Sequence, residues 1–243
     1  MNTALNQSVA SRWAKLGVMF NIEPVEETPD IERLLLDTSR AASANSRLFI
    51  LGAGWLALYG DFVAKHRLVQ LILAELEREF RPTLGFLLEW SMTDGGGSRF
   101  NQAIDACGSA IDARPLSDVE CRNTVFTQLA EQRASPLSRK WGRWMEEFEL
   151  KTRALRPDYW IAEQNPSLAD RALTGGDLLA SVLAECEADG GIIESESELA
   201  RRCGVSRPAM RQAIRRLVMA GRIRSIDRGK MRAVELLRRP IPI

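Results

Sequence analysis

Apolar residues recur at helical spacing along most of the first 175 residues, with polar and charged residues between them. Proline, glycine and capping residues divide this part into segments, each preceded by a start signal for a helix. Helices are predicted to begin after Thr28-Pro29-Asp30, after Asn45-Ser46 and at Pro82. A longer helix is predicted from Asp61 to Glu79, with its apolar residues on one face.

Two further helices are predicted before residue 150. Ser117 and Glu120 have the spacing of a capping box, which predicts a helix running to about Arg133. Four large apolar residues at i, i+3, i+4 and i+7 predict the next helix: Trp141, Trp144, Met145 and Phe148. Since no stretch of this half alternates apolar and polar residues as a half-buried strand does, it is predicted to be all-helical.

The C-terminal part predicts three helices followed by two strands. The first helix covers residues 177–188, the second has the sequence ELARRC, and the third covers residues 207–219. Because the turn Gly204-Val205-Ser206 is so short, the second and third helices must cross steeply. The segments RIRSI and MRAVELL, joined by a turn at Asp227-Arg228-Gly229-Lys230, predict a β-hairpin over 222–237.

A hinge is expected between these two parts. Proline-bearing segments at Arg156-Pro157 and Asn165-Pro166 are followed by Gly175-Gly176. The predicted fold is therefore mainly α, with an all-helical domain over residues 1–175 and a winged helix-turn-helix over residues 176–243. The wing is the β-hairpin that follows the three helices.

Charge is distributed unevenly along the chain, although the formal net charge is only +1. From Glu196 to the end, 13 basic residues accompany four acidic ones, a net charge of +9. The preceding 195 residues carry 20 basic and 28 acidic residues, a net charge of −8. A polyanion such as DNA would therefore be attracted to the C-terminal end alone.

The third helix of the C-terminal part combines an apolar face with a row of arginines. Arg207, Arg211 and Arg215 stand at i, i+4 and i+8, and Gln212 lies beside them. The apolar face consists of Met210, Ile214, Leu217 and Val218. Long donors on the exposed side of such a helix can reach phosphate oxygens and the O6 and N7 atoms of guanine in the major groove.

The tip of the predicted wing is also basic. Arg228 and Lys230 flank Gly229 at the turn between the two strands. A β-ribbon of this kind can follow the DNA backbone or enter the minor groove, where basic side chains meet a high negative potential.

The segment SESELARRCGVSRPAMRQAIRRLVMAGRIRSIDRGKMRAV resembles the winged helix-turn-helix of the GntR family of bacterial repressors. The resemblance covers Asp177 to Leu237 and rests on S-E-x-E-L-A, G-V-S-R, R-x-A-[IL]-R-R-L and the R-G-K wing tip. It implies DNA contacts by Ser206, Arg207, Arg211, Gly229 and Lys230. The chain differs from the family at Ser197, Pro208 and Gln212, where Arg, a hydroxyl residue and Glu are common. The family places this domain at the N-terminus, which is the reverse of the order here.

These features predict a DNA-binding transcriptional regulator that is not an enzyme. The helical domain is expected to serve oligomerisation or to sense a small-molecule or protein effector. One winged helix buries little surface, so a homodimer on a two-fold site of double-stranded DNA is expected. Two alternatives are a replication or partition protein of a plasmid or mobile element, and an enzyme whose helical domain acts on nucleic acid. A single histidine, His66, and the lack of a clustered acidic motif argue against the enzyme.

No cofactor or metal site is predicted. The segment from Leu51 to Ala57 imitates a dinucleotide fingerprint, but helices surround it, which favours close helix packing instead. The four cysteines form no CxxC pair and are expected to be reduced, mostly buried thiols. All six tryptophans precede the C-terminal part, and core packing is favoured over an effector pocket for them. With neither an export signal nor an apolar run of membrane length, a cytoplasmic protein is expected.

Overall fold

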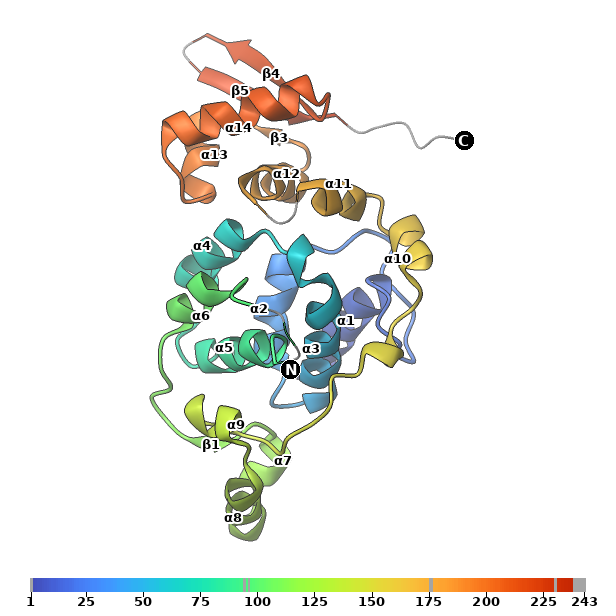
Figure 1. Ribbon diagram of the computed structural model, residues 1–243, viewed down its shortest axis with the longest axis vertical. Coiled ribbons are helices and arrows are strands. Elements are labelled where there is room, and N and C mark those ends of the chain that lie inside the picture. Colours follow the sequence, from blue (N-terminus) through green and yellow to red (C-terminus); the bar gives the residue numbers. More distant parts are fainter. Residues whose placement is uncertain (1, 94, 96, 175–176, 230, 238–243) are drawn as a thin grey trace.

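The computed structural model describes residues 2–93, 95, 97–174, 177–229 and 231–237. The described chain is mainly α-helical, as the sequence predicted, and it carries a three-stranded antiparallel sheet near its C-terminal end (Figure 1). Described residues between 2 and 174 form a bundle of helices, here called the helical body. Those between 177 and 237, called the C-terminal unit, lie at one end of it.

Helices of four to 14 residues make up most of the helical body. Its α-helices are α1 (Asn2–Lys15), α2 (Ile31–Ala41), α3 (Ser46–Tyr59), α4 (Lys65–Glu75), α5 (Arg81–Trp90), α6 (Asn101–Cys107), α7 (Asp118–Cys121), α8 (Thr124–Arg133), α9 (Pro136–Lys140), α10 (Asp158–Gln164) and α11 (Ser167–Thr174). Two 3₁₀ helices, η1 (Gly60–Phe62) and η2 (Thr152–Ala154), and two strands, β1 (Arg114–Pro115) and β2 (Arg143–Trp144), complete it.

The core of the helical body lies where α1, α2, α3 and α5 pack together. Phe49 of α3 contacts Phe86 of α5, with ring centroids 4.7 Å apart. Trp13 of α1 meets Trp55 of α3 edge to face at 5.5 Å, and both are fully buried. The Trp13 indole nitrogen donates to the Thr38 hydroxyl at 2.8 Å, which satisfies its polar atom inside the core.

The glycine pattern that imitates a dinucleotide fingerprint lies inside α3. A Cβ atom at Gly52 would lie 3.3 Å from the Trp13 ring, and one at Gly54 would lie 3.2 Å from the backbone of Lys151. The two glycines therefore allow close packing against α3, which is the interpretation that the sequence favoured.

Two of the predicted helix starts are confirmed by their caps. The Asp30 carboxylate accepts from the Arg33 amide at 3.1 Å and begins α2. The Asn45 side chain accepts from the Arg47 amide at 3.2 Å and begins α3. Pro82 lies in the first turn of α5, where its missing N–H costs nothing.

The prediction of one helix over residues 61–79 was wrong. The chain forms η1 and α4 there, separated by Val63, which is extended (φ −70°, ψ 128°) and fully buried. The Ala64 amide donates to the Glu32 carboxylate at 2.7 Å, so a side chain of α2 caps the start of α4. Packing against α2 therefore overrides the helical spacing of this segment.

The helix predicted from Ser117 to Arg133 is interrupted. Ser117 caps α7, but that helix ends at Cys121. The Asn123 side chain then accepts from the Val125 amide at 2.8 Å and starts α8. A second capping residue therefore divides the predicted helix into two.

The stripe of large apolar residues that begins at Trp141 is not helical, so the prediction of a helix there was wrong. Gly142 has φ +57°, which ends the turn after α9. The Leu116 amide donates to the Trp144 carbonyl at 2.9 Å, and β1 pairs with β2 in parallel. Trp141 packs against Gly85 of α5. Pairing with a distant segment thus replaces helical hydrogen bonds here. The N-terminal part was predicted to be all-helical, and this short sheet corrects that prediction.

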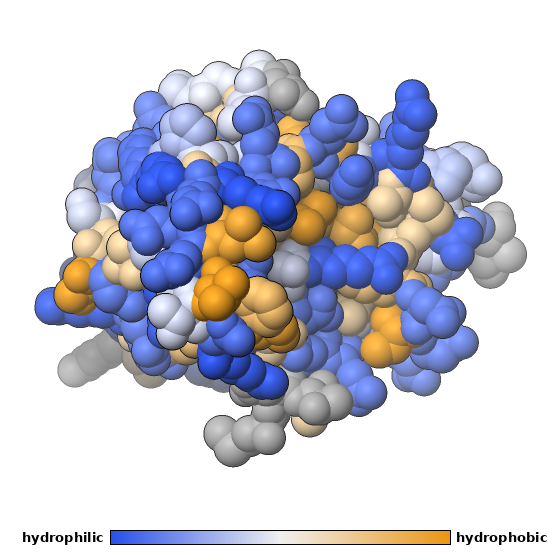
Figure 2. All heavy atoms as spheres, turned by 90° about the horizontal axis from the view of Figure 1, so that it is seen from below, coloured by the Kyte–Doolittle hydropathy of each residue, from blue (hydrophilic) through white to orange (hydrophobic). Residues whose placement is uncertain are grey.

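An apolar surface lies at the end of the molecule opposite the three-stranded sheet, where α8 projects (Figure 1). Val119, Val125, Phe126 and Leu129 are 58, 66, 50 and 39% exposed. Viewed from this end, apolar side chains gather among charged ones (Figure 2). Ala130 is the buried residue of α8, so this helix contributes little to the core of the helical body.

The C-terminal unit has its own apolar core. Its elements are α12 (Leu178–Ala188), β3 (Ile192–Ile193), α13 (Glu196–Arg202), α14 (Arg207–Met219), β4 (Ile223–Arg228) and β5 (Met231–Leu236). The strand order is β3-β5-β4, and both pairs are antiparallel. Buried residues between Leu179 and Val234 form the core between the helices and the sheet. The hairpin was predicted, whereas β3 was not.

Among the described residues, no helix is both long and apolar enough to cross a membrane. Three of the four free cysteines are buried, namely Cys107, Cys186 and Cys203. Burial raises the pKa of Cys107 and of Cys186 to about 12, which keeps these thiols protonated.

Candidate nucleic-acid interface

α14 has a buried side and an exposed side. The Ser206 hydroxyl caps its start by accepting from the Ala209 amide at 3.4 Å, and Pro208 occupies the first turn. Gly221 follows its end with φ +64°. The buried side consists of Met210, Ala213, Ile214 and Leu217. Val218, expected on this side, is 41% exposed.

The predicted DNA-contacting residues of α14 lie together on its exposed side. Arg207, Arg211, Gln212 and Arg215 are all exposed, and so is the capping residue Ser206. A helix that is held by one side and presents long donors on the other has the form that a major groove accommodates.

The arginines of α14 differ in their acidic neighbours. Arg211 has its Nε atom 3.9 Å from a Glu196 oxygen, and its side chain is 65% exposed. Arg207, Arg215 and Arg216 form no ion pair with any described residue. The exposed side of α14 therefore keeps most of its positive charge available for an anion.

In the hairpin, by contrast, Arg228 and Arg232 are paired with acids. Arg228 donates to Glu194 at 2.5 Å. Arg232 donates to Asp227 at 3.0 Å and lies 3.7 Å from Glu196. The predicted basic tip is therefore partly neutralised by side chains outside the turn.

The turn of the hairpin is shorter than predicted. Arg228 still belongs to β4 and pairs with Met231, so two residues connect the strands. Gly229 is exposed and has φ +64°, a conformation that favours glycine. Lys230, the other predicted residue of the tip, lies outside the described residues.

Ion pairs connect α13 to α12, so the arginines of α13 are not all available to a ligand. Glu198 accepts from Arg201 at 2.6 Å and from Arg202 at 2.9 Å, which lowers the pKa of Glu198 to about 2. Arg202 also lies 3.2 Å from Asp189 and 3.7 Å from Glu185. Arg202 therefore has a structural role within the C-terminal unit.

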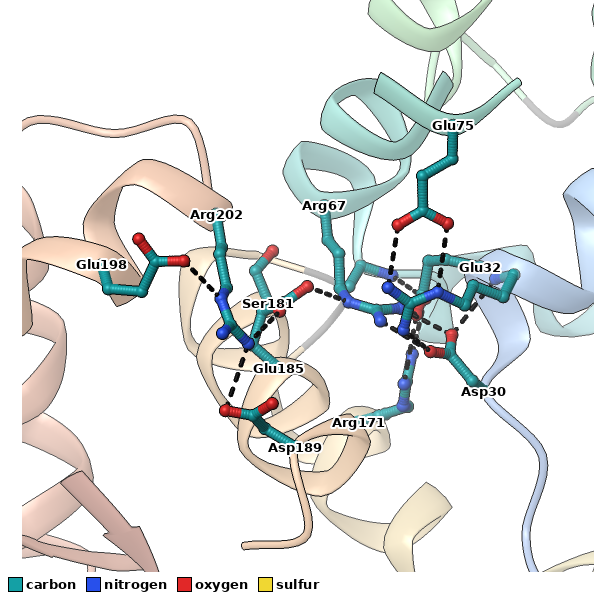
Figure 3. A network of polar contacts seen from close by, with 12 residues as sticks. Asp30, Glu32, Arg67, Glu75, Arg171, Ser181, Glu185, Asp189, Glu198 and Arg202 are labelled. Atoms are coloured by element: carbon teal, nitrogen blue, oxygen red, sulfur yellow. Dashed lines mark hydrogen bonds and ion pairs between the residues drawn. The ribbon is translucent and has the colours of Figure 1, made fainter. Parts of the chain in front are cut away.

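A buried arginine joins the C-terminal unit to the helical body (Figure 3). Arg67 of α4 is completely buried. It donates to Asp30 at 2.6 Å, to Glu32 at 2.8 Å and to Glu185 of α12 at 2.5 Å. Arg171 of α11 donates to Glu32 at 2.6 Å. These five residues are called the Arg67 cluster.

Small residues surround this junction. Ala64, which precedes α4, packs against Ala180 and Ala184 of α12, and all three are buried. Gly204, in the turn before α14, lies against the side chain of Gln70 of α4. The helical body therefore contacts α12 and the α13–α14 turn, while the hairpin lies on the far side of the C-terminal unit (Figure 1).

Charge pairing lowers the pKa of Asp30 and raises the pKa of Arg67. Burial alone would raise the pKa of Asp30, but hydrogen bonds and positive charge from Arg67 lower it. Burial disfavours the Arg67 cation, but the surrounding carboxylates raise its pKa. Asp30 and Arg67 are thus held in their charged forms near neutral pH.

Acid is expected to weaken this cluster. Because the pKa of Asp30 in the folded chain is below its ordinary value of 3.8, ionised Asp30 adds stability above that pH. This contribution is lost as the pH falls through the folded-state pKa. Between about pH 6 and pH 2, the free energy of unfolding in urea should fall less for Asp30→Asn than for wild type. Asparagine can still cap the start of α2.

Asp105→Asn is the matched control for this experiment. Asp105 is exposed on α6 and has no ion pair within the described residues. The control variant should follow the wild-type pH profile, and an unaltered profile in Asp30→Asn as well would contradict the assignment.

The histidine and the tryptophans singled out in the sequence lie in the helical body. His66 is exposed on α4. No group of three or more His, Cys, Asp or Glu suited to a metal ion occurs among the described residues. Four of the six tryptophans are buried, namely Trp13, Trp55, Trp90 and Trp141, which fits the core packing that was favoured.

Comparison with protein-family models, curated proteins and solved structures found no match to this chain.

Sequence reasoning missed the acidic partners of the interface. Glu194 precedes α13 and Glu196 is its first residue, yet they lie beside Arg228, Arg211 and Arg232 of later elements. No local pattern links residues so far apart in the chain, so these pairs could not be read from spacing.

Proposed function

We propose that the C-terminal unit is a winged helix-turn-helix of the GntR type and binds double-stranded DNA, and that the chain is a transcriptional regulator. The observation that carries the proposal is the one-sided exposure of α14. Arg207, Arg211 and Arg215 lie on its exposed side, and Arg207 and Arg215 have no acidic partner among the described residues.

In this proposal α14 enters the major groove with its first turn leading. Arg207 and Arg211 reach phosphates or guanine edges, and Gln212 is suited to adenine, whose N6 and N7 atoms match an amide. The hairpin follows the adjacent backbone through Arg228 and Gly229, and Lys230 is proposed to extend this contact.

The helical body provides oligomerisation or sensing in this proposal. A single C-terminal unit offers a small contact surface, so a homodimer is needed for tight and specific binding. Contacts of α12 and the α13–α14 turn with the body would hold each C-terminal unit in a fixed orientation.

Selection from a random library of double-stranded DNA with the full chain tests this function. We expect one enriched sequence with two-fold related half-sites, bound at least roughly 10³-fold more tightly than a scrambled duplex at the same salt concentration. Equal affinity for all sequences, or no binding, would contradict the proposal. Tandem repeats in place of two-fold related half-sites would favour a replication or partition protein.

Removing an acidic neighbour of the interface is expected to strengthen DNA binding. Glu196 lies 3.9 Å from Arg211 and 3.7 Å from Arg232, so its charge would both compete with phosphates and repel them. Glu196→Gln should raise affinity by roughly two- to fivefold, which corresponds to about 0.4–1 kcal/mol for a partly exposed charge. Fluorescence anisotropy of a labelled duplex at fixed salt measures the change.

Glu163→Gln serves as the control, because Glu163 is exposed on α10 in the helical body. It removes the same charge without touching the interface. A weaker complex with Glu196→Gln would mean that Glu196 itself contacts the DNA, for example as an acceptor for the cytosine amino group.

A further inference from the structure

A hollow of about 480 Å³ opens on the helical body between residues 18–24 and the start of α10. Its volume lies within the range of pockets that hold small molecules. It lies apart from the exposed side of α14, since α10 and α1 belong to the helical body (Figure 1). The proposed DNA interface therefore makes no use of it.

Backbone hydrogen bonds hold the two walls of the hollow together. The Arg156 amide donates to the Gly17 carbonyl at 2.7 Å, and the Met19 amide donates to the Ala154 carbonyl at 2.9 Å. Val18 and Leu155 form an isolated antiparallel bridge beside them. The hollow is thus a preformed feature of the fold and needs no rearrangement to accept a ligand.

The lining includes buried apolar residues and half-buried aromatic rings beside polar and charged residues. Ala14 and Val18 are buried at 6 and 2% exposure, and Phe20 and Trp160 are half-buried. No described residue accepts a hydrogen bond from the Trp160 indole nitrogen. Unlike the four buried tryptophans, Trp160 offers both a ring face and a free donor to a ligand.

The hollow is also lined by a cationic side chain, that of Arg156. The Arg156 guanidinium lies 5.6 Å from the centre of the Trp160 ring, and Arg156 forms no ion pair with a described residue. This cation–π contact leaves the N–H groups of the guanidinium for an acceptor. A carboxylate matches this donor in a bidentate manner.

The charge of the lining sets a limit on the ligand. Glu23 also lines the hollow, so a polyanion such as a nucleotide phosphate would meet repulsion beside the one arginine of the lining. A single carboxylate on an apolar or aromatic body suits both the charge and the apolar surface.

We propose that this hollow binds a small monocarboxylate with an aromatic or apolar body. The carboxylate is bound by Arg156, and the body packs between Phe20 and Trp160 over Val18. The site does not rest on the proposed DNA-binding function, because it is defined by residues of the helical body alone.

Isothermal titration calorimetry of the full chain with indole-3-propionate tests the site. We expect saturable binding with one ligand per chain, and we expect Arg156→Ala to weaken it by roughly tenfold or more through the loss of a charged hydrogen bond. Tryptamine, which has the same ring system but no carboxylate, should bind at least tenfold more weakly than indole-3-propionate.

Arg153→Ala is the matched control, because Arg153 is exposed close by in the chain and does not line the hollow. It should leave the affinity unchanged. The side chain of Arg156 is also exposed, so both variants should unfold at the wild-type temperature. Lack of binding at millimolar ligand, equal binding by tryptamine, or full affinity in Arg156→Ala would overturn the proposal.

Discussion

Replacing Arg67 by alanine is expected to lower the free energy of unfolding by about 3–5 kcal/mol, because it leaves buried carboxylates without their shared cation. Arg67 is completely buried and donates to Asp30, Glu32 and Glu185 within 2.8 Å. Arg171 and Arg33 would remain to compensate part of the negative charge. Urea unfolding, monitored by tryptophan fluorescence, measures the loss of unfolding free energy.

Two further variants make this prediction specific. Arg78→Ala removes an exposed arginine that follows α4 and has no ion pair within the described residues, so its free energy of unfolding should stay within about 0.5 kcal/mol of wild type. A double-mutant cycle with Glu185→Gln should give a coupling energy of roughly 0.5–3 kcal/mol. Additive effects would show that Arg67 does not stabilise the junction through Glu185.

Arg211→Ala is expected to weaken specific DNA binding by about 1–3 kcal/mol, which is roughly 5- to 150-fold in Kd, if its guanidinium reaches a base edge as proposed. Arg211 occupies the middle of the exposed row and its side chain is 65% exposed. Truncation should therefore leave the fold intact. Anisotropy titrations at a fixed salt concentration measure the loss, and titrations at several concentrations give the salt slope.

Arg216→Ala provides a control on the same helix. Arg216 is exposed and free of ion pairs within the described residues, but it lies about 140° around α14 from Arg211. It should lower the affinity far less than Arg211→Ala does. Unchanged affinity in Arg211→Ala, or an equal loss in both variants, would contradict the assigned face of α14.

Local signals predicted the start of several helices correctly. Asp30, Asn45 and Ser206 each cap the helix that follows them, because a short polar side chain can reach the free amides of the first turn in any context. The buried side of α14 followed from its apolar spacing for a similar reason, although the exposure of Val218 shows that the end of this stripe depends on its neighbours.

Segments whose conformation depends on distant contacts were predicted incorrectly. Val63 interrupts a helical pattern because the start of α4 is capped by Glu32 of α2. The residues after Gly142 are extended because their backbone pairs with residues 114–116. Helical spacing cannot distinguish these cases, since the energy that decides them comes from partners elsewhere in the chain.

The candidate interface also has features that the sequence predicted and features that depend on distant contacts. Sequence by itself determined the arginine row of α14, since residues four apart share a helix face and the basic composition is concentrated at one end. Only the tertiary structure decided which arginines keep a free charge, by placing Glu194 and Glu196 beside Arg228 and Arg211. It also brought Asp30, Arg67 and Glu185 together, because charges far apart in sequence interact only once folding has placed them within a few ångströms of one another.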